Sequence, residues 1–147
     1  MSDTLIIQII GLYEQDQINF ANYLSKKYGI NLFFANQFTE KDLQETIDKY
    51  SSFILKNKTF IIVGSIFNFI KAGFYKRDYL IWLDKKDENK INNKNKMNKF
   101  NEVFREYEIS NSKKIIIDSN LNLRDQEKIF LNIMEKKDYE YIQGKDK

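Results

Sequence analysis

The sequence predicts an α/β fold: a three-layer sandwich in which a five-stranded, mostly parallel sheet lies between two layers of helices. The main observation is an alternation of short apolar runs with segments whose apolar residues recur every three or four positions. The first run, residues 5–10, is almost uninterrupted, as expected of a strand covered on both faces. The alternation continues along nearly the whole chain, which is typical of a parallel sheet with crossover helices.

The first half of the chain predicts three strands and two helices. Strands are expected at residues 5–10, 30–35 and 59–64. The first helix carries an apolar stripe and stops at Gly29, a favourable residue for a helix end. Thr39 and Asp42 resemble a capping box before the second helix, at 40–57. The apolar stripes consist of Ile18, Ala21, Leu24 and Tyr28 in the first helix, and of Leu43, Ile47, Tyr50 and Ile54 in the second.

The second half continues the alternation. A short helix and loop are expected at 65–78, and strands at 79–84 and 113–118. A helix between these strands is marked by Met97, Phe100, Phe104 and Tyr107, and a last helix by Ile129, Phe130, Ile133 and Met134. We expect one domain at 1–140, containing a Lys- and Asn-rich loop at 84–99, and a frayed tail at 141–147.

Composition excludes several classes of function. The chain has 147 residues, no cysteine and no histidine, which removes thiolate nucleophiles, imidazole bases and most zinc sites. Its net charge of +3 is a weak argument for nucleic acid as a partner. No apolar stretch approaches the length of a membrane span, and the apolar run near the start is too short for a signal peptide. We therefore expect a soluble, intracellular protein with no membrane insertion.

Ligands of such sheets bind outside the carboxyl ends of the strands. In that light, three segments resemble the P-loop nucleotide kinases, particularly the dephospho-coenzyme A kinase and deoxynucleoside monophosphate kinase branch. They are "IIGLYEQDQINFANYLSKKYG", "FIIVGSIFNFIKAGFYKRDYLIWLD" and "KKIIIDSNLNLRDQEKIFLNI". The resemblance implies a kinase-like order of elements, with the phosphate loop in the turn at 11–18.

That turn departs from the GxxxxGK[ST] pattern of the family. Gly11 matches the first glycine, but Asp16, Gln17 and Ile18 stand where the second glycine, the lysine and the Mg²⁺-binding hydroxyl belong. Losing the lysine and gaining an aspartate costs around 5 kcal/mol for a single phosphate charge. Lys26 lies roughly 15 Å along the helix and cannot replace the lysine.

Other expected parts of the kinase site are also missing. The third predicted strand is followed by no acid until Asp78, and Arg77 and Arg105 are the only arginines before the last turn and helix. If a nucleotide were still bound, the resemblance would assign it to Gly11, Gln15, Gln17, Lys85, Lys86 and Asp118. An Asx turn that caps the final helix through Ser119 or Asn120 is a competing interpretation of Asp118.

We therefore predict a non-catalytic kinase-like protein that acts as a binding or structural subunit of a larger assembly, with no cofactor and no metal. An alternative is a small nucleotide kinase with an atypical phosphate loop, which would use ATP and Mg²⁺ and recruit Lys85, Lys86 or Lys90. A third is a flavodoxin-like regulatory module in which Asp84 is phosphorylated.

An aromatic segment suggests where a protein partner would bind. Phe67, Phe69, Phe74 and Tyr75 are too closely spaced for one helix face to bury. An exposed apolar patch usually marks a protein interface. Interleaved aromatic and lysine residues could also suit single-stranded nucleic acid, but no alternation of the two types supports that interpretation.

Overall fold

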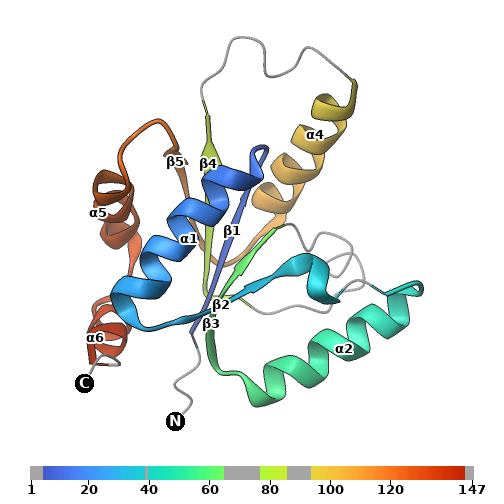
Figure 1. Ribbon diagram of the computed structural model, residues 1–147, viewed down its shortest axis with the longest axis horizontal. Coiled ribbons are helices and arrows are strands. Elements are labelled where there is room, and N and C mark those ends of the chain that lie inside the picture. The colour runs from blue at the N-terminus through green and yellow to red at the C-terminus, as the bar shows by residue number, and fades with distance from the viewer. Residues whose placement is uncertain (1–4, 39, 65–76, 86–93, 145–147) are drawn as a thin grey trace.

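The computed structural model describes residues 5–38, 40–64, 77–85 and 94–144 (Figure 1). They form a five-stranded parallel sheet with helices on both faces, as the sequence predicts. The strands are β1 (Leu5–Gly11), β2 (Asn31–Phe34), β3 (Thr59–Val63), β4 (Tyr79–Asp84) and β5 (Lys113–Asp118). The helices are α1 (Glu14–Tyr28), α2 (Leu43–Lys56), α4 (Lys94–Ile109), α5 (Leu123–Ile133) and α6 (Lys136–Gly144), and a 3₁₀ turn, η1 (Ala35–Phe38), follows β2.

The strand order distinguishes between the two predicted topologies. The order is β2-β3-β1-β4-β5, so β1 lies between β3 and β4. In the flavodoxin-like order, 2-1-3-4-5, β1 would instead lie between β2 and β3. The flavodoxin-like alternative is therefore wrong. The register places Ile9 beside Val63 and Gly11 beside Leu83, which sets the carboxyl ends of the central strands next to one another.

The two faces of β1 enter different parts of the core, because successive side chains of a strand point to opposite sides. Leu5, Ile7 and Ile9 pack with residues of α1, α5 and α6. Ile6 packs with residues of α2, and Ile10 packs with residues of α4. Helices thus cover both faces of the sheet, with α1 and α5 together on one side and α2 and α4 on the other (Figure 1).

The start of α1 differs from the sequence-based expectation. We predicted a turn over residues 11–18, but α1 begins at Glu14, so only Leu12 and Tyr13 separate it from β1. Glu14 and Asp16 lie in the first turn, where acids are stabilised by the helix dipole. The end of the helix is as predicted: Gly29 adopts a left-handed conformation with φ 66°.

The caps of the later helices also refine the predictions. Asp42 caps α2 by accepting a hydrogen bond from the Gln44 backbone N–H at 3.2 Å, and Thr39 lies outside the described residues. Most of the predicted helix and loop at 65–78 also lies outside them, as do residues 86–93 of the Lys- and Asn-rich loop. The last part of that predicted loop is helical, because α4 begins at Lys94.

The C-terminal segment is more ordered than predicted. Helix α5 ends at its C-cap, Met134, and a separate helix, α6, runs on to Gly144. Residues 141–144 are therefore helical and not a frayed tail. The reason is tertiary packing: Ile142 is 1% exposed, and the Tyr141 hydroxyl lies 2.8 Å from the Thr59 hydroxyl. Among the described helices, none has both the length and the apolar character that crossing a membrane requires.

Candidate functional site

The β1–α1 crossing is the feature that the kinase resemblance singles out. Gly11 ends β1 next to Leu83 of β4. A Cβ atom at Gly11 would stand 2.7 Å from the Leu83 carbonyl oxygen and 3.3 Å from Gln17 Nε2. Such distances leave no room for a side chain, so glycine is required here by the packing of the strands and of α1. The glycine that sequence reasoning assigned to a phosphate loop therefore has a structural explanation.

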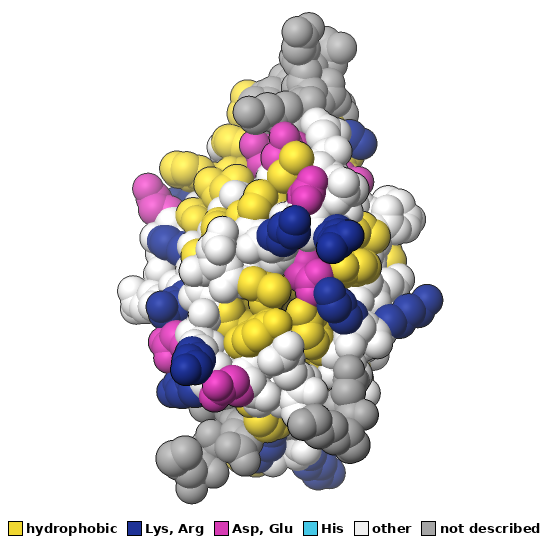
Figure 2. Space-filling model, turned by 90° about the vertical axis from the view of Figure 1, so that its left-hand side faces the viewer, with side chains coloured by type: hydrophobic (Ala, Val, Ile, Leu, Met, Phe, Trp, Pro, Cys, Tyr) yellow, Lys and Arg dark blue, Asp and Glu magenta, His cyan; other side chains and the backbone are white. Residues whose placement is uncertain are grey.

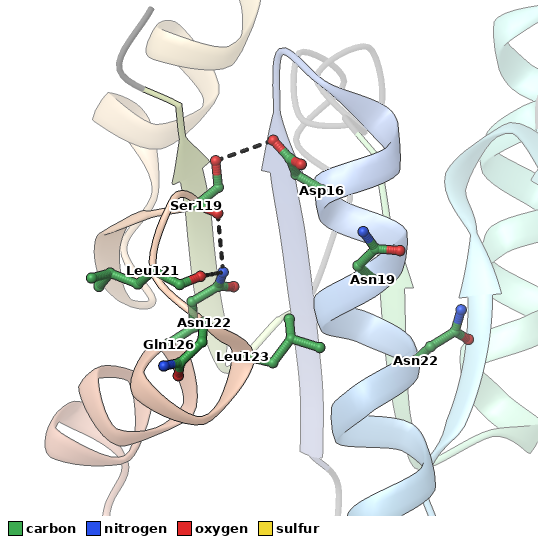
Figure 3. A pocket seen from close by; sticks show the side chains of 8 residues that line it. All are labelled: Asp16, Asn19, Asn22, Ser119, Leu121, Asn122, Leu123 and Gln126. Carbon is green, nitrogen blue, oxygen red and sulfur yellow. Dashed lines mark hydrogen bonds between the residues drawn. The ribbon is translucent and has the colours of Figure 1, made fainter.

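The first turn of α1 presents an acid toward β5. Asp16 accepts a hydrogen bond from Ser119 Oγ at 3.1 Å (Figure 3). Lys85 Nζ lies 4.0 Å from the same carboxylate. The Lys85 ammonium also lies 5.4 Å from the centre of the Tyr13 ring. Tyr13 precedes the helix without providing a side-chain cap. The charge of Lys85 is thus offset by Asp16 at the edge of the sheet where a triphosphate would bind.

Gln17 occupies the position at which the family carries its lysine. Its side chain is only 3% exposed and lines a cavity of about 230 Å³ at the carboxyl ends of β1 and β3. The cavity wall also includes Glu14 and Glu102, two acids, and Lys99, one base. A phosphate group would meet more negative than positive side chains there.

A larger cavity, of about 570 Å³, lies between α1 and the β5–α5 loop (Figure 3). Its lining is mainly amide and hydroxyl side chains with two leucines: Asp16, Asn19, Asn22, Ser119, Leu121, Asn122, Leu123 and Gln126. Gln126 donates hydrogen bonds to the Ser119 and Leu121 carbonyl oxygens at 3.3 and 2.8 Å. Its buried Oε1 has no hydrogen-bond partner within the described part of the chain. None of these described lining residues is a lysine or an arginine that would attract phosphate.

Two further predicted nucleotide contacts, Gln15 and Asp118, have hydrogen-bond partners close to them in the chain. Gln15 is exposed and donates to Asn19 one turn along α1, at 2.8 Å. Asp118 accepts from the Asn120 backbone N–H at 2.9 Å, which is the Asx turn that we weighed against a binding role. The cap of α5 is Asn122, which accepts from the Asp125 N–H at 2.8 Å, and not Ser119 or Asn120. Lys86 and Lys90 lie outside the described residues, as do Phe67, Phe69, Phe74 and Tyr75.

A buried polar cluster on the α4 side of the sheet was not predicted from the sequence. Arg77 Nη1 lies 2.7 Å from Glu106 Oε2, and Gln8 Nε2 donates to the same oxygen at 2.8 Å. Arg77 Nη1 also donates to Gln8 Oε1, and Gln8 Nε2 to the Gly64 carbonyl oxygen at 2.7 Å. The one signal in the sequence was Gln8, a polar residue in an otherwise apolar strand. Arg77, one of the two arginines before the last turn and helix, is thus buried in the interior.

A second buried carboxylate joins α1 to α5. Glu127 is 3% exposed and accepts hydrogen bonds from the Tyr23 hydroxyl and Lys27 Nζ, each at 2.8 Å, and from the Tyr28 hydroxyl. Burial by itself would raise the pKa of Glu127, but the hydrogen bonds from Lys27, Tyr28 and Tyr23 outweigh it and lower the pKa. Burial and the contact with Glu127 raise the pKa of Tyr28. We interpret this cluster as structural, because its polar groups form hydrogen bonds with one another and so hold α1 against α5.

Metal binding finds no support in the described residues. Within residues 5–38, 40–64, 77–85 and 94–144, no group of three or more acidic side chains is arranged to hold an ion.

Comparisons with known proteins identify the fold and nothing finer. No family model matches the sequence. No curated protein matches it either. The structure resembles that of a sugar kinase from Janibacter sp. HTCC2649, with a TM-score of 0.58 and 11% identity over 88% of this chain and 94% of that chain. It also resembles an uncharacterized protein from Eubacterium ventriosum ATCC 27560, with a TM-score of 0.52 and 16% identity over 88% of this chain and 98% of that chain. These similarities and the strand order agree with the kinase-like fold predicted from the sequence.

Proposed function

We propose that this protein is a non-catalytic relative of the nucleotide kinases, of the dephospho-coenzyme A kinase and deoxynucleoside monophosphate kinase branch, and acts as a binding or structural subunit of a larger assembly. The observation that carries the proposal is the β1–α1 crossing. Only Leu12 and Tyr13 connect Gly11 to the first helical residue, Glu14.

A phosphate loop works because glycine-rich backbone outside the helix directs several N–H groups at the phosphate oxygens. Two connecting residues are too few to form such a cradle. The first N–H groups of α1 remain without intrahelical partners, as at every helix start. However, the Glu14 and Asp16 carboxylates lie in the same turn and would repel a phosphate. The turn therefore supports the loss of triphosphate binding more strongly than the missing motif residues alone.

The competing proposal, an active kinase with an atypical loop, has one observation in its favour. Lys85 places a cation near the start of α1. However, this ammonium lies 4.0 Å from Asp16, so the pair has little net charge to offer a phosphate. Arg77 cannot help either, because its side chain is 1% exposed and paired with Glu106. We therefore prefer the non-catalytic function.

The partner in this proposal is another protein. The surface that we predicted for it, formed by Phe67, Phe69, Phe74 and Tyr75, lies outside the described residues and stays a prediction. Side chains of both signs are mixed on the face that carries α5, with no broad region of one charge (Figure 2). This mixture gives no support to nucleic acid as the partner, which would favour a basic face.

The test is a binding and transfer experiment with ATP and Mg²⁺. We expect millimolar ATP·Mg²⁺ to leave the melting temperature unchanged, because a ligand stabilises only the fold that binds it. We also expect no phosphoryl transfer to nucleoside monophosphates or to sugars, which are tested because a sugar kinase has a similar fold. An active nucleoside monophosphate kinase in the same assays serves as the positive control.

If phosphoryl transfer is detected, a pair of variants tests whether it depends on Lys85, as the competing proposal of an active kinase requires. Lys85→Ala removes the cation beside α1, and Lys136→Ala removes an exposed lysine at the start of α6. Phosphoryl transfer that is lost in the first variant and kept in the second would establish the active kinase and contradict our proposal. Affinity capture from the native source, followed by mass spectrometry, then tests the second half of the proposal, since a structural subunit should be recovered with stable partners.

A further inference from the structure

β5 forms one edge of the sheet, and the N–H and C=O groups of its successive residues point alternately toward β4 and away from it. The Lys113 N–H donates to the Asp78 carbonyl oxygen at 3.3 Å, and the Ser119 N–H donates to the Asp84 carbonyl oxygen at 3.2 Å. Odd-numbered residues of β5 therefore direct their N–H and C=O groups toward β4. Because successive residues of a strand alternate, Lys114, Ile116 and Asp118 direct theirs away from the sheet. Within the described part of the chain no strand pairs with this outer side of β5. An unpaired edge of this kind is a template for another strand.

The side chains on this edge form an apolar centre between two opposite charges. Ile116 lies beside Trp82 in the register and is 48% exposed, whereas Trp82 is 5% exposed under α4. Lys114 and Asp118 stand two residues to either side of Ile116 on the same face. The opposite face of the strand carries Ile115 and Ile117, which belong to the core shared with α5. Hydrophobic side chains also reach the surface elsewhere on this side of the molecule (Figure 2).

Many proteins carry lysines on their edge strands, which prevent the edge from pairing with another chain. Lys114 could have this effect on β5. Its ammonium group is engaged elsewhere: it donates to the Tyr107 carbonyl oxygen at 2.9 Å and to the Ser110 carbonyl oxygen at 3.3 Å, at the end of α4. The lysine is thus held beside the helix terminus and leaves Ile116 open to solvent. The edge is consequently charged at its two ends and apolar at its centre.

We propose that β5 pairs antiparallel with β5 of a second copy of this chain, about a two-fold axis at Ile116, to join the two five-stranded sheets. In this register Ile116 lies opposite Ile116 of the second copy, and Lys114 lies opposite its Asp118. Moving the axis one residue toward either end places Lys114 or Asp118 opposite the apolar Ile116. The Lys114 ammonium keeps its positive charge while it bonds to the carbonyl oxygens at the end of α4. This register therefore sets unlike charges opposite each other, and a second copy is the occupant that automatically supplies it.

The outward backbone groups fit the same register. The Ile116 N–H reaches the Ile116 carbonyl oxygen of the second copy, and the Asp118 N–H reaches its Lys114 carbonyl oxygen; symmetry repeats both bonds. The Asp118 carbonyl oxygen is already used, since it accepts from the Leu121 N–H at 3.2 Å. The pairing buries few residues, so we expect a weak dimer that forms as the concentration rises. It does not depend on the proposed loss of phosphoryl transfer.

Sedimentation equilibrium of the full chain over a range of concentrations tests the pairing. We expect a reversible dimer that Ile116→Asp weakens about tenfold or more, because two carboxylates would then face each other. The matched control is Leu55→Asp, which adds the same charge at an exposed position on α2, 73% exposed, and leaves the dimer intact. Asp118→Asn, which keeps an acceptor for the Asx turn, weakens the dimer about fivefold.

Amide hydrogen exchange followed by NMR gives an independent readout of the edge. The Ile116 and Asp118 amides should gain protection with concentration, while the Ile115 and Ile117 amides, directed at β4, should be protected at all concentrations. A chain that stays monomeric throughout, a dimer that survives Ile116→Asp, or a dimer whose Ile116 amide remains unprotected would each overturn the proposal.

Discussion

Arg77 and Glu106 form an ion pair in the interior: the Arg77 Nη1 and Glu106 Oε2 atoms are 2.7 Å apart, and their side chains are 1% and 0% exposed. Gln8 of the central strand bonds to both side chains. The pair therefore ties α4 to the middle of the sheet at a point where an unpaired charge would be costly.

The first prediction concerns this pair. Glu106→Gln keeps the shape of the side chain but leaves Arg77 without its counter-charge, so we expect the free energy of unfolding to fall by about 3–5 kcal/mol. Urea denaturation measures the loss. Glu108→Gln, at an exposed position of the same helix, is the control and should change stability by less than about 0.5 kcal/mol. Equal stabilities of the two variants would show that the buried charge needs no partner.

The second prediction concerns the strand end at Gly11. Gly11→Ala forces a Cβ atom to within 2.7 Å of the Leu83 carbonyl oxygen, so β1 or β4 must shift. We expect a loss of about 1–3 kcal/mol in the free energy of unfolding, as for other overpacked positions. Gly144→Ala is the matched control, because a Cβ atom there meets nothing within 4 Å. Thermal and urea unfolding distinguish the two variants, and a stable Gly11→Ala protein would contradict the close approach.

The third prediction concerns the pH dependence that Glu127 confers. Its pKa is lower in the folded protein than in the unfolded chain, so its stabilising contribution is complete above the unfolded pKa and disappears as the pH falls through the folded pKa. Glu127→Gln should be less stable than the wild type near neutral pH, by about 2 kcal/mol. The difference should shrink on acidification below the ordinary pKa of glutamate.

Urea unfolding at a series of pH values measures that difference. Glu140→Gln, an exposed glutamate of α6, is the control and should parallel the wild type throughout. A wild-type advantage over Glu127→Gln that stays constant from neutral to acidic pH would argue against a lowered pKa of Glu127.

The fourth prediction concerns the missing phosphate loop. The triple variant Asp16→Gly, Gln17→Lys, Ile18→Ser restores the residue types of the family pattern. We nevertheless expect no ATP affinity by isothermal titration calorimetry, because α1 begins at Glu14 and leaves two connecting residues. The variant should also be less stable, since a lysine would replace the buried Gln17. Micromolar ATP binding by this variant would mean that side chains alone, and not the crossing, had removed the site.

Much of the candidate site could be anticipated from the sequence. The absent lysine, hydroxyl and glycine of the phosphate loop were visible at once, and so was the Asx turn at Asp118. The sequence could not reveal that Gly11 is enclosed by Leu83, because that contact joins residues 72 positions apart. It also gave no sign that Glu127 would be buried. An acid in the second turn of a helix is usually exposed, and here three donors from α1 make its burial tolerable.

The sequence by itself determined the local elements: five strands and the helices between them follow from apolar periodicity, which needs no knowledge of distant residues. Tertiary structure decided the order of those strands and the packing of residues 141–144. The physical reason is the same in each case. Hydrogen-bond partners, buried counter-charges and apolar contacts between segments far apart in the chain contribute free energies that no local pattern encodes.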